Sequence, residues 1–291
     1  MAGRSYCLMK SRTRTLIITL IGSWLVVFGV LPILLLLVAS FLGQDPEAFF
    51  ELSLSLEAYR QLVDPGYLRV LLRSVWLAVL TTVFCLLIGY PFAWLTVRLN
   101  RRSRLLVLIL LMIPFWTNSL VRTYAIRMVL GTQGLLNKLL LQLGLIDTPI
   151  RILYTDTAVV LGLFYLMLPF MILPLYANME KFDFRLVEAA RDLGAGFVAT
   201  FRSIVWPLTL PGVLAGCIMV FVPTMGLFYV ASLLGGARQL LVGNLIHQQF
   251  LNARNWPLGS ATSVVLIIMM ALMLGVYGLF MRNLALRSHE P

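Results

Sequence analysis

The composition of this chain is that of an integral membrane protein. It has 291 residues, of which 60% are apolar and 12% are charged, and its mean hydropathy is +0.92. A soluble domain has about 25% charged residues, so an ordinary soluble protein is excluded. The formal net charge of +11 does not indicate nucleic-acid binding, because the sequence offers no basic soluble face with interleaved aromatic residues.

Six apolar segments predict six transmembrane helices. Each exceeds the roughly 18 residues needed to cross a hydrocarbon core about 30 Å thick. None contains Asp or Glu, and the Arg residues within them lie near segment ends, where long side chains reach the interface. The predicted fold class is therefore an all-α membrane protein with six transmembrane helices. The segments are 15–42, 71–97, 105–128, 157–177, 208–234 and 260–281.

The basic residues predict the orientation and the domain limits. More than half of the 23 Lys and Arg fall in four segments on one side: the tail 1–14, the second-to-third connection, the loop 178–208 and the tail 282–291. By the positive-inside rule, both tails and these loops are cytoplasmic, and 15–281 forms one membrane domain. The first connection on the other side is acidic, and its carboxylates either attract cations or meet a partner protein. These acids are Asp45, Glu47, Glu51, Glu57 and Asp64.

The first apolar segment has a second interpretation, as a cleaved signal peptide that follows basic residues. Its apolar run of about 28 residues is much longer than the 7–15 residues of a signal core, which favours a retained helix. Cys7, Cys85 and Cys217 have no CxxC spacing. We therefore expect packing roles for the cysteines and neither a disulfide framework nor a metal site.

The sequence carries no recognisable catalytic constellation. No lysine lies in a G-K-[ST] motif, so the chain has no P-loop for ATP. His247 and His289 lie outside the apolar segments, and no HExxH motif is present. We expect a chain that is not an enzyme and binds no cofactor or metal. An intramembrane carboxylate for proton coupling is also missing, so the energy source is expected outside this chain.

The loop 178–208 contains a charged helix that is unusual in so apolar a chain. Asp183 is the predicted N-cap, Gly194 is the predicted left-handed C-cap, and a second helix is predicted from Phe197 to a stop at Pro207. The spacing of its apolar residues alone is also compatible with a surface helix that lies on the membrane interface. The predicted apolar stripe of the first helix consists of Leu186, Ala189, Ala190 and Leu193.

The spacing of this loop resembles the EAA loop of binding-protein-dependent ABC importer permeases. The matching residues are Glu188-Ala189-Ala190, Gly194, Ile204 and Pro207, and Trp206 departs from the leucine that the family favours before the proline. The resemblance implies that the short helix docks in a cleft of an ATPase subunit and couples ATP hydrolysis to transport. The coupling residues it implies are Glu188, Ala189, Ala190, Asp192 and Gly194.

Four further stretches resemble the permease subunits of spermidine/putrescine importers: YPFAWL at 90–95, PFWTNSLVRTYA at 114–125, LPFMILPLY at 168–176 and MGLFYVASLLGGARQLLVGN at 225–244. The similarity runs along nearly the whole chain. It implies the type I ABC importer permease fold in a bacterial inner membrane. It also implies a second homologous permease, two ATPase subunits that carry ATP and Mg²⁺, and a periplasmic polyamine-binding protein. A homodimeric permease, an importer of another small solute and a non-transporting membrane scaffold are the alternatives.

A polyamine path requires negative charge, carbonyl dipoles or aromatic faces for ammonium groups. This chain offers mainly aromatic residues, although Trp and Tyr also pack between helices or at interfaces. Ser232 and Asn255 stand where some polyamine permeases carry an acidic residue, so either the partner permease supplies the charge or the substrate differs. The candidate path residues are Trp94, Trp116, Asn118, Tyr124, Tyr165, Phe228 and Tyr229.

Prolines and glycines predict where the helices break or approach closely. Pro114 is expected to interrupt the third segment, Pro169 and Pro174 the fourth, and Pro223 the fifth, because broken helices expose carbonyls along a cavity. Gly212 and Gly216 form a GxxxG pattern, which favours a close helix contact over a binding site. The connection between the fifth and sixth segments, around His247, is expected to meet the binding protein.

Overall fold

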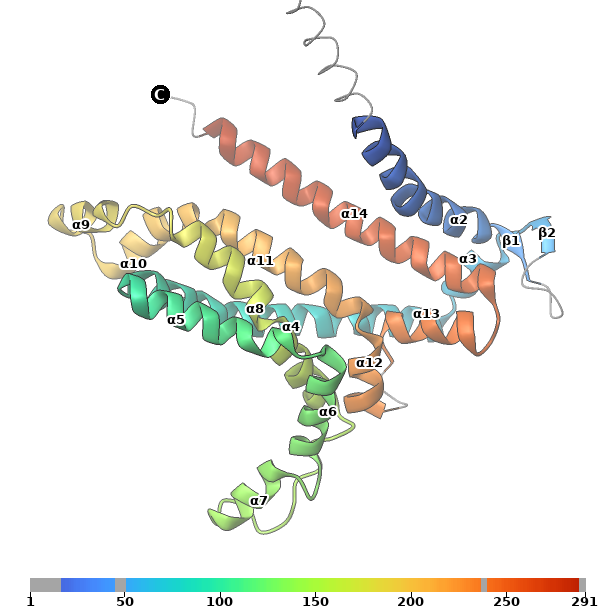
Figure 1. Cartoon of the computed structure of the whole chain (residues 1–291), viewed down its shortest axis with the longest axis horizontal. Helices are drawn as coiled ribbons and strands as arrows, with labels where there is room; N and C mark the ends of the chain where they lie inside the picture. The colour runs from blue at the N-terminus through green and yellow to red at the C-terminus, as the bar shows by residue number, and fades with distance from the viewer. Residues whose placement is uncertain (1–16, 45–50, 237–239, 288–291) are drawn as a thin grey trace, which may run out of the picture. The chain divides into compact units, whose positions relative to one another are not determined.

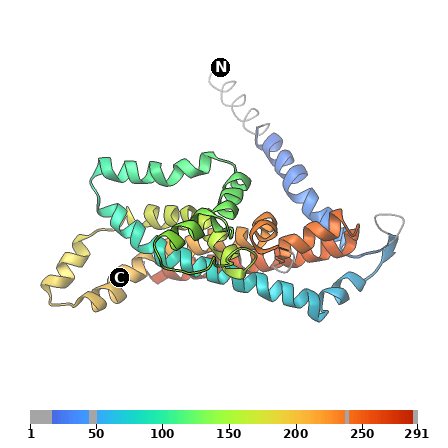
Figure 2. The same cartoon turned by 90° about the horizontal axis from the view of Figure 1, so that it is seen from below.

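The computed structural model describes residues 17–44, 51–236 and 240–287 (Figures 1 and 2). The predicted tail 1–14 and residues 288–291 lie outside these ranges. Within these ranges, five helices are long and apolar enough to cross a membrane, and one bent helix pair gives a sixth span when it is counted as one. The predicted six-helix membrane fold is therefore confirmed. The five are Ile17–Ala39, Pro65–Arg98, Asp156–Met179, Phe197–Gly226 and Trp256–Leu279.

The third span is longer and more sharply bent than predicted. The prediction was a single segment, 105–128, interrupted at Pro114. Arg101–Trp116 and Ser119–Gln142 meet at 93°. The first half is α5 (Arg101–Met112) followed by a 3₁₀ turn, Ile113–Trp116; the second is α6 (Ser119–Leu130) followed by α7 (Leu135–Gln142). Figure 1 shows α6 and α7 directed away from the axis of α5. Pro114 lies inside the 3₁₀ turn, so the predicted break is confirmed.

The chain divides into two compact units. One comprises residues 1–64 with 248–268, and the other residues 65–247 with 269–291. The first unit contains α2 (Leu31–Ala39), a two-stranded antiparallel sheet and α3 (Glu57–Leu62). In the sheet, β1 (Leu42–Gly43) pairs with β2 (Glu51–Leu54), and Leu42 lies opposite Leu54. This small sheet is an addition to the predicted all-α fold.

Asn255 stabilises the first unit. Its Oδ1 accepts the Leu258 N–H at 3.1 Å, at the start of α14 (Trp256–Arg287), and its Nδ2 donates to Gln44 Oε1 at 2.8 Å. The side chain is buried, and Phe250 packs edge-on against Trp256 nearby. Asn255 thus has a structural role at a position where the sequence raised the question of a missing charge.

The core of the second unit lies between α4 (Pro65–Arg98), α8 (Asp156–Met179) and α11 (Trp206–Gly226), which all pack against one another. Glycines permit the close approach. A Cβ on Gly216 would lie 2.7 Å from the Met171 sulfur, and one on Gly212 would lie 2.6 Å from Asn178 Cβ. The predicted helix contact at Gly212 and Gly216 is confirmed, because no side chain fits there.

Several prolines behave differently from the prediction. Pro169 and Pro174 lie inside α8, which runs unbroken from Asp156 to Met179, so the predicted interruption of the fourth segment is wrong. Pro207 also fails to stop a helix, because Phe197–Gly226 continues through it. Helices packed within a bundle tolerate proline because neighbouring helices and local adjustments satisfy the freed carbonyls. Proline spacing alone cannot reveal this packing.

The fifth span ends earlier than the predicted residue 234. α11 stops at Gly226, and α12 (Phe228–Val230) and a π-helical turn, Ala231–Gly235, follow. The start of α13 (Val242–Leu251) crosses this break so closely that a Cβ on Gly243 would lie 2.6 Å from the Gly226 carbonyl oxygen. At the other end of the chain, α14 continues past the predicted limit of 281 to Arg287.

Candidate functional site

The charged helix of loop 178–208 is α9 (Arg185–Asp192), and local residues define both of its ends. The helix begins one residue later than predicted, with Phe184 as its N-cap, and Asp183 Oδ1 accepts the Arg185 N–H at 3.0 Å just before the first turn. At the other end Gly194 has φ +83°, the left-handed conformation predicted for it. The Ala195 N–H donates to Ala190 O and the Gly194 N–H to Arg191 O, both at 2.9 Å. These two bonds form a complete Schellman cap.

The buried face of α9 differs from the predicted stripe. Val187 and Ala190 are buried against the rest of the second unit, whereas Leu193 is 89% exposed and Leu186 is 45% exposed. Of the predicted coupling residues, Ala190 alone faces inward; the other members of the set point outward or lie in the exposed bend. Those outward residues are Glu188, Ala189, Asp192 and Gly194. The exposed face therefore combines two carboxylates with two uncovered leucines.

An aromatic cluster packs the residues before α9 against the end of α4, and we call this cluster the seat of α9. The Trp94 ring lies 5.3 Å from Phe184 and 5.8 Å from Phe182, measured between centroids. The Arg98 guanidinium carbon lies 4.7 Å above the Trp94 ring and 5.6 Å from Phe184. Trp94 is one of the predicted path residues, but these contacts place it in the aromatic cluster that supports α9. The sequence signal for the pairing of Trp94 with Arg98 is their i, i+4 spacing on one helix.

Beyond the glycine bend, the chain enters the fifth span through α10 (Phe197–Thr200) and a π-helical turn, Phe201–Val205. A cavity of about 180 Å³ lies between this entry, the end of α4 and the inner face of α9. Its walls include Tyr90, Trp94 and Phe201, and Arg98 and Arg191 also line it. Tyr90 is fixed by a 3.0 Å hydrogen bond with Thr209.

A second polar contact ties α5 to the same end of the bundle. Arg104 Nη1 lies 3.0 Å from Glu180 Oε1, and Tyr176 donates to the same oxygen at 2.8 Å. Both contacts lie where α8 passes into loop 178–208. The position of the loop is thus set by aromatic packing on α4 and by polar contacts from α5.

The bend in the third span exposes two of the candidate path residues. Trp116 ends the 3₁₀ turn and is 84% exposed, and Asn118 caps α6 by accepting the Leu120 N–H at 2.8 Å. Phe115 packs edge-on against Phe170 of α8, and the Arg122 guanidinium lies 4.6 Å from the Phe115 ring centroid. The Nε and Nη1 atoms of Arg122 are buried and have no hydrogen-bond partner within the described residues.

The break after α11 brings together two other candidates. Phe228 stacks on His247 at 4.7 Å and meets Tyr229 edge-on at 6.0 Å. Asn244 holds the break: its Nδ2 donates to Phe228 O at 2.9 Å and to Ser232 Oγ at 2.6 Å, and its Oδ1 accepts the Leu241 N–H at 3.1 Å. Asn244 was not among the predicted residues. Leu241 lies three positions before it, but Phe228 and Ser232 lie 16 and 12 positions away, so local spacing does not indicate its contact with the break.

Tyr124 on α6 and Tyr165 on α8 complete the candidate path residues. Both side chains are exposed, Tyr124 by 51% and Tyr165 by 43%. The rings are available to another chain, a lipid or a substrate, and the fold does not use them for its own core.

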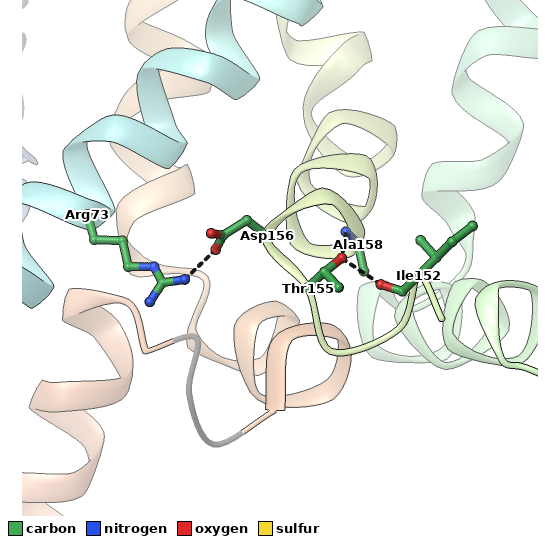
Figure 3. A network of polar contacts seen from close by, with 5 residues as sticks. All are labelled: Arg73, Ile152, Thr155, Asp156 and Ala158. Carbon is green, nitrogen blue, oxygen red and sulfur yellow. Dashed lines mark hydrogen bonds and ion pairs between the residues drawn. The ribbon is translucent and has the colours of Figure 1, made fainter. Parts of the chain in front are cut away.

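Figure 3 shows an ion pair between Arg73, near the start of α4, and Asp156, the first residue of α8. Arg73 Nη2 donates to Asp156 Oδ1 at 2.6 Å, and the two side chains are 32% and 52% exposed. Thr155 caps α8 by accepting the Ala158 N–H, and its hydroxyl donates to Ile152 O at 2.6 Å. The polar network therefore joins the starts of α4 and α8, while the aromatic seat joins the end of α4 to the loop after α8.

No group of three or more His, Cys, Asp or Glu residues with metal-binding geometry occurs within residues 17–44, 51–236 and 240–287. Multiple apolar spans and a charged helix exposed beside a glycine bend define a multi-pass helical membrane protein. The chain belongs to the family of binding-protein-dependent transport system inner membrane components, which matches residues 85–289. It is a multi-pass inner-membrane permease of an ABC importer and not a catalytic subunit.

Two relatives support this assignment, and one solved structure shows the same fold. The chain is 53% identical over 262 residues to the spermidine/putrescine transport system permease protein PotB of Escherichia coli (strain K12), covering 90% of this chain and 95% of that protein. It is 48% identical over 270 residues to the protein of the same name from Haemophilus influenzae, covering 93% and 94%. One solved structure is a bacterial alginate ABC transporter in complex with an alginate-bound periplasmic protein. The match covers 96% of this chain and 95% of the matched transporter chain, with a TM-score of 0.71. At 15% identity, that structural match shows the fold alone.

Proposed function

We propose that this permease carries polyamines, with putrescine and spermidine as its substrates. The observation that carries the proposal is the 53% identity, over 90% of the chain, to a protein named for spermidine and putrescine transport. The structure supports a transport role through the exposed helix α9. This helix is short and exposed, and a bend at Gly194 joins it to the fifth span, so it can receive motion from another subunit.

The coupling contact is the outward face of α9. Glu188 and Asp192 offer carboxylates for charge-assisted bonds to a basic partner, and the small Ala189 permits close approach. Leu193 and Leu186 add exposed apolar area that a cleft in an ATPase subunit would cover. Because Trp94 and Phe184 hold the inner face, movement of α9 is transmitted to the end of α4.

The proposed assembly contains this chain, a second homologous permease, two ATPase subunits that bind ATP and Mg²⁺, and a periplasmic polyamine-binding protein. The surface proposed for the second permease is the arm formed by α6 and α7, which carries many exposed apolar side chains. They include Val121, Tyr124, Met128, Leu135 and Leu139. Uncovered apolar area of this kind indicates an interface with protein or lipid.

Loop 178–208 faces the cytoplasm in this proposal, because the ATPase subunits are soluble and hydrolyse cytoplasmic ATP. Both termini are then also cytoplasmic, since the positive charges of the tails lie on the same side as this loop. The connections around Glu57 and His247 face the binding protein on the outer side.

The proposed substrate path uses the two helix breaks. Trp116 and Asn118 flank one break, Phe228 and Tyr229 follow the other, and the remaining members are Tyr124 and Tyr165. An ammonium group over a desolvated aromatic ring gains about 2 kcal/mol. Irregular backbone at membrane depth is tolerated where it lines a cavity, which supports a path beside the breaks.

ATP-dependent uptake into proteoliposomes tests the proposal. The complete complex, with its binding protein, is reconstituted and supplied with labelled putrescine or spermidine. We expect saturable uptake of both, and uptake lowered at least tenfold by Glu188→Ala in a complex that still assembles. Lys181→Ala is the matched control, because Lys181 is also exposed in the same loop but precedes α9.

Uptake of another solute without any polyamine uptake would exclude the substrate assignment and leave the importer role intact. Equal uptake by wild type and Glu188→Ala would exclude the coupling role of that carboxylate.

A further inference from the structure

The cavity behind α9 has a composition that transport and coupling do not explain. It combines aromatic walls with two guanidinium groups, those of Arg98 and Arg191. Within the described part of the chain, neither arginine forms an ion pair with a carboxylate. Arg98 is held in place by the rings of Trp94 and Phe184 instead. The site therefore presents two positive charges beside an apolar pocket, and the one on Arg98 is held by aromatic rings.

The depth of the cavity matches the headgroup region of a bilayer. α4 has 34 residues and is roughly 50 Å long, so its ends extend beyond a hydrocarbon core about 30 Å thick. Arg98 is its last residue, Trp94 lies one turn further in, and Tyr90 lies two turns further in. Arginine at the phosphate level with Trp and Tyr just below it is the usual order of side chains at a membrane interface.

The charge of the site selects among possible occupants. A polyamine would be repelled by two guanidinium groups, so the cavity is not part of the substrate path. A zwitterionic lipid would gain little from the positive charge. An anionic phospholipid suits both features, because its phosphate can bond the guanidinium groups while part of an acyl chain enters the aromatic pocket.

We propose that this cavity binds one anionic phospholipid of the cytoplasmic leaflet, with Arg98 and Arg191 as its phosphate ligands. The membrane side rests on the proposed function, which places loop 178–208 in the cytoplasm. Arg98 belongs to α4 and Arg191 to the coupling helix, so the bound headgroup joins the two. The lipid stabilises the seating of α9, and the anionic lipid content of the membrane regulates coupling.

Native mass spectrometry of the purified complete complex tests the site. The complex is titrated with phosphatidylglycerol, cardiolipin or phosphatidylcholine, and the fraction that retains lipid is measured. We expect preferential retention of the anionic lipids. A hydrogen bond from a guanidinium to a bound phosphate contributes a factor of at least about ten in affinity, so Arg98→Gln with Arg191→Gln should lower retention at least tenfold. Arg101→Gln with Arg102→Gln is the matched control, because it removes the same charge from the adjacent segment and should lower retention less than twofold.

A second variant tests the apolar half of the site. Phe197→Ser removes an aromatic wall, and because Phe197 is 77% exposed the change should not affect folding. We expect retention to fall at least threefold with both arginines intact. Equal loss in the control pair, equal retention of phosphatidylcholine, or crosslinking of a photoreactive group at position 197 to an ATPase subunit instead of lipid would overturn the proposal. Lipid retention is read without any transport step, so a failure of polyamine uptake is a separate result.

Discussion

The two ends of the bundle are built differently. At the end that carries α9, rings and apolar side chains pack tightly: Trp94, Phe182 and Phe184 lie within 6 Å of one another between centroids, and Val187 is buried beside them. The regions around the helix breaks have isolated ring pairs, such as Phe228 with His247, and single polar side chains, Asn118 and Asn244, that bond free backbone groups. A packed aromatic contact transmits displacement, whereas polar bonds to free backbone groups can exchange partners as a path opens and closes. The difference suits two roles. In the proposed function, the end that carries α9, here called the input region, receives motion from the ATPase, and the regions around the helix breaks move during transport.

The largest expected effect comes from disturbing the packing of α8 against α11, on which both regions depend. Gly216→Val places a branched side chain against Met171, where even a Cβ comes within 2.7 Å of the sulfur. Overpacking of this kind costs about 3 kcal/mol, and we expect a clear fall in the melting temperature of the detergent-purified protein. Gly278→Val is the control, because a Cβ there meets nothing within 4 Å. Equal melting temperatures of the two variants would show that α8 and α11 are not in tight contact.

The next effect is specific to the input region. Gly194→Ala forces a left-handed residue with φ +83° to carry a Cβ, at a cost of about 1–2 kcal/mol. The correctly bent loop should then be about five- to thirtyfold less populated, and ATP-driven uptake should fall with it. Gly196→Ala is a close control, because Gly196 has φ −68° and, like Gly194, no atom near its Cβ position. A comparable loss in both variants would show that the bend at Gly194 has no special role.

A smaller and local effect is expected at the break after α11. Asn244→Ala leaves the Leu241 N–H without its partner and removes the bonds to Phe228 and Ser232, which costs about 1–2 kcal/mol. Hydrogen exchange should increase in α12 and at the start of α13 while α9 remains protected. The exposed Asn252→Ala is the control. An increase spread evenly over the chain would mean that the two regions are not separate.

The smallest effect is expected at the Arg73–Asp156 ion pair. Both side chains are partly exposed, so Arg73→Gln should lower stability by less than about 1 kcal/mol. Screening should reduce the difference further at high salt, which melting temperatures at low and high ionic strength would reveal. Arg69→Gln on the same exposed turn of α4 serves as the comparison. A large effect that does not depend on salt would indicate a role in transport geometry beyond a surface ion pair.

Local chemistry explains which features of the coupling loop were predictable. Gly194 acts on its own backbone neighbours, so spacing was enough to predict the end of α9, whereas the N-cap lies at Phe184, one residue after the predicted Asp183. The face that α9 buries was predicted wrongly: Leu186 and Leu193 are exposed, and Val187 is buried. The spacing of apolar residues predicts an apolar stripe on the helix. Which face of α9 is buried depends on how Trp94 and Phe184 pack against each other.

The sequence by itself determined the membrane class, the six spans, the family resemblance and the close contact at Gly212 and Gly216. These follow from composition, segment length and residue size, which do not require knowledge of distant neighbours. Only the tertiary structure decided that Trp94 supports α9, that α8 continues through its prolines, and that Asn244 holds the break after α11. Each depends on groups far apart in the chain, whose energies exist only once the helices have packed.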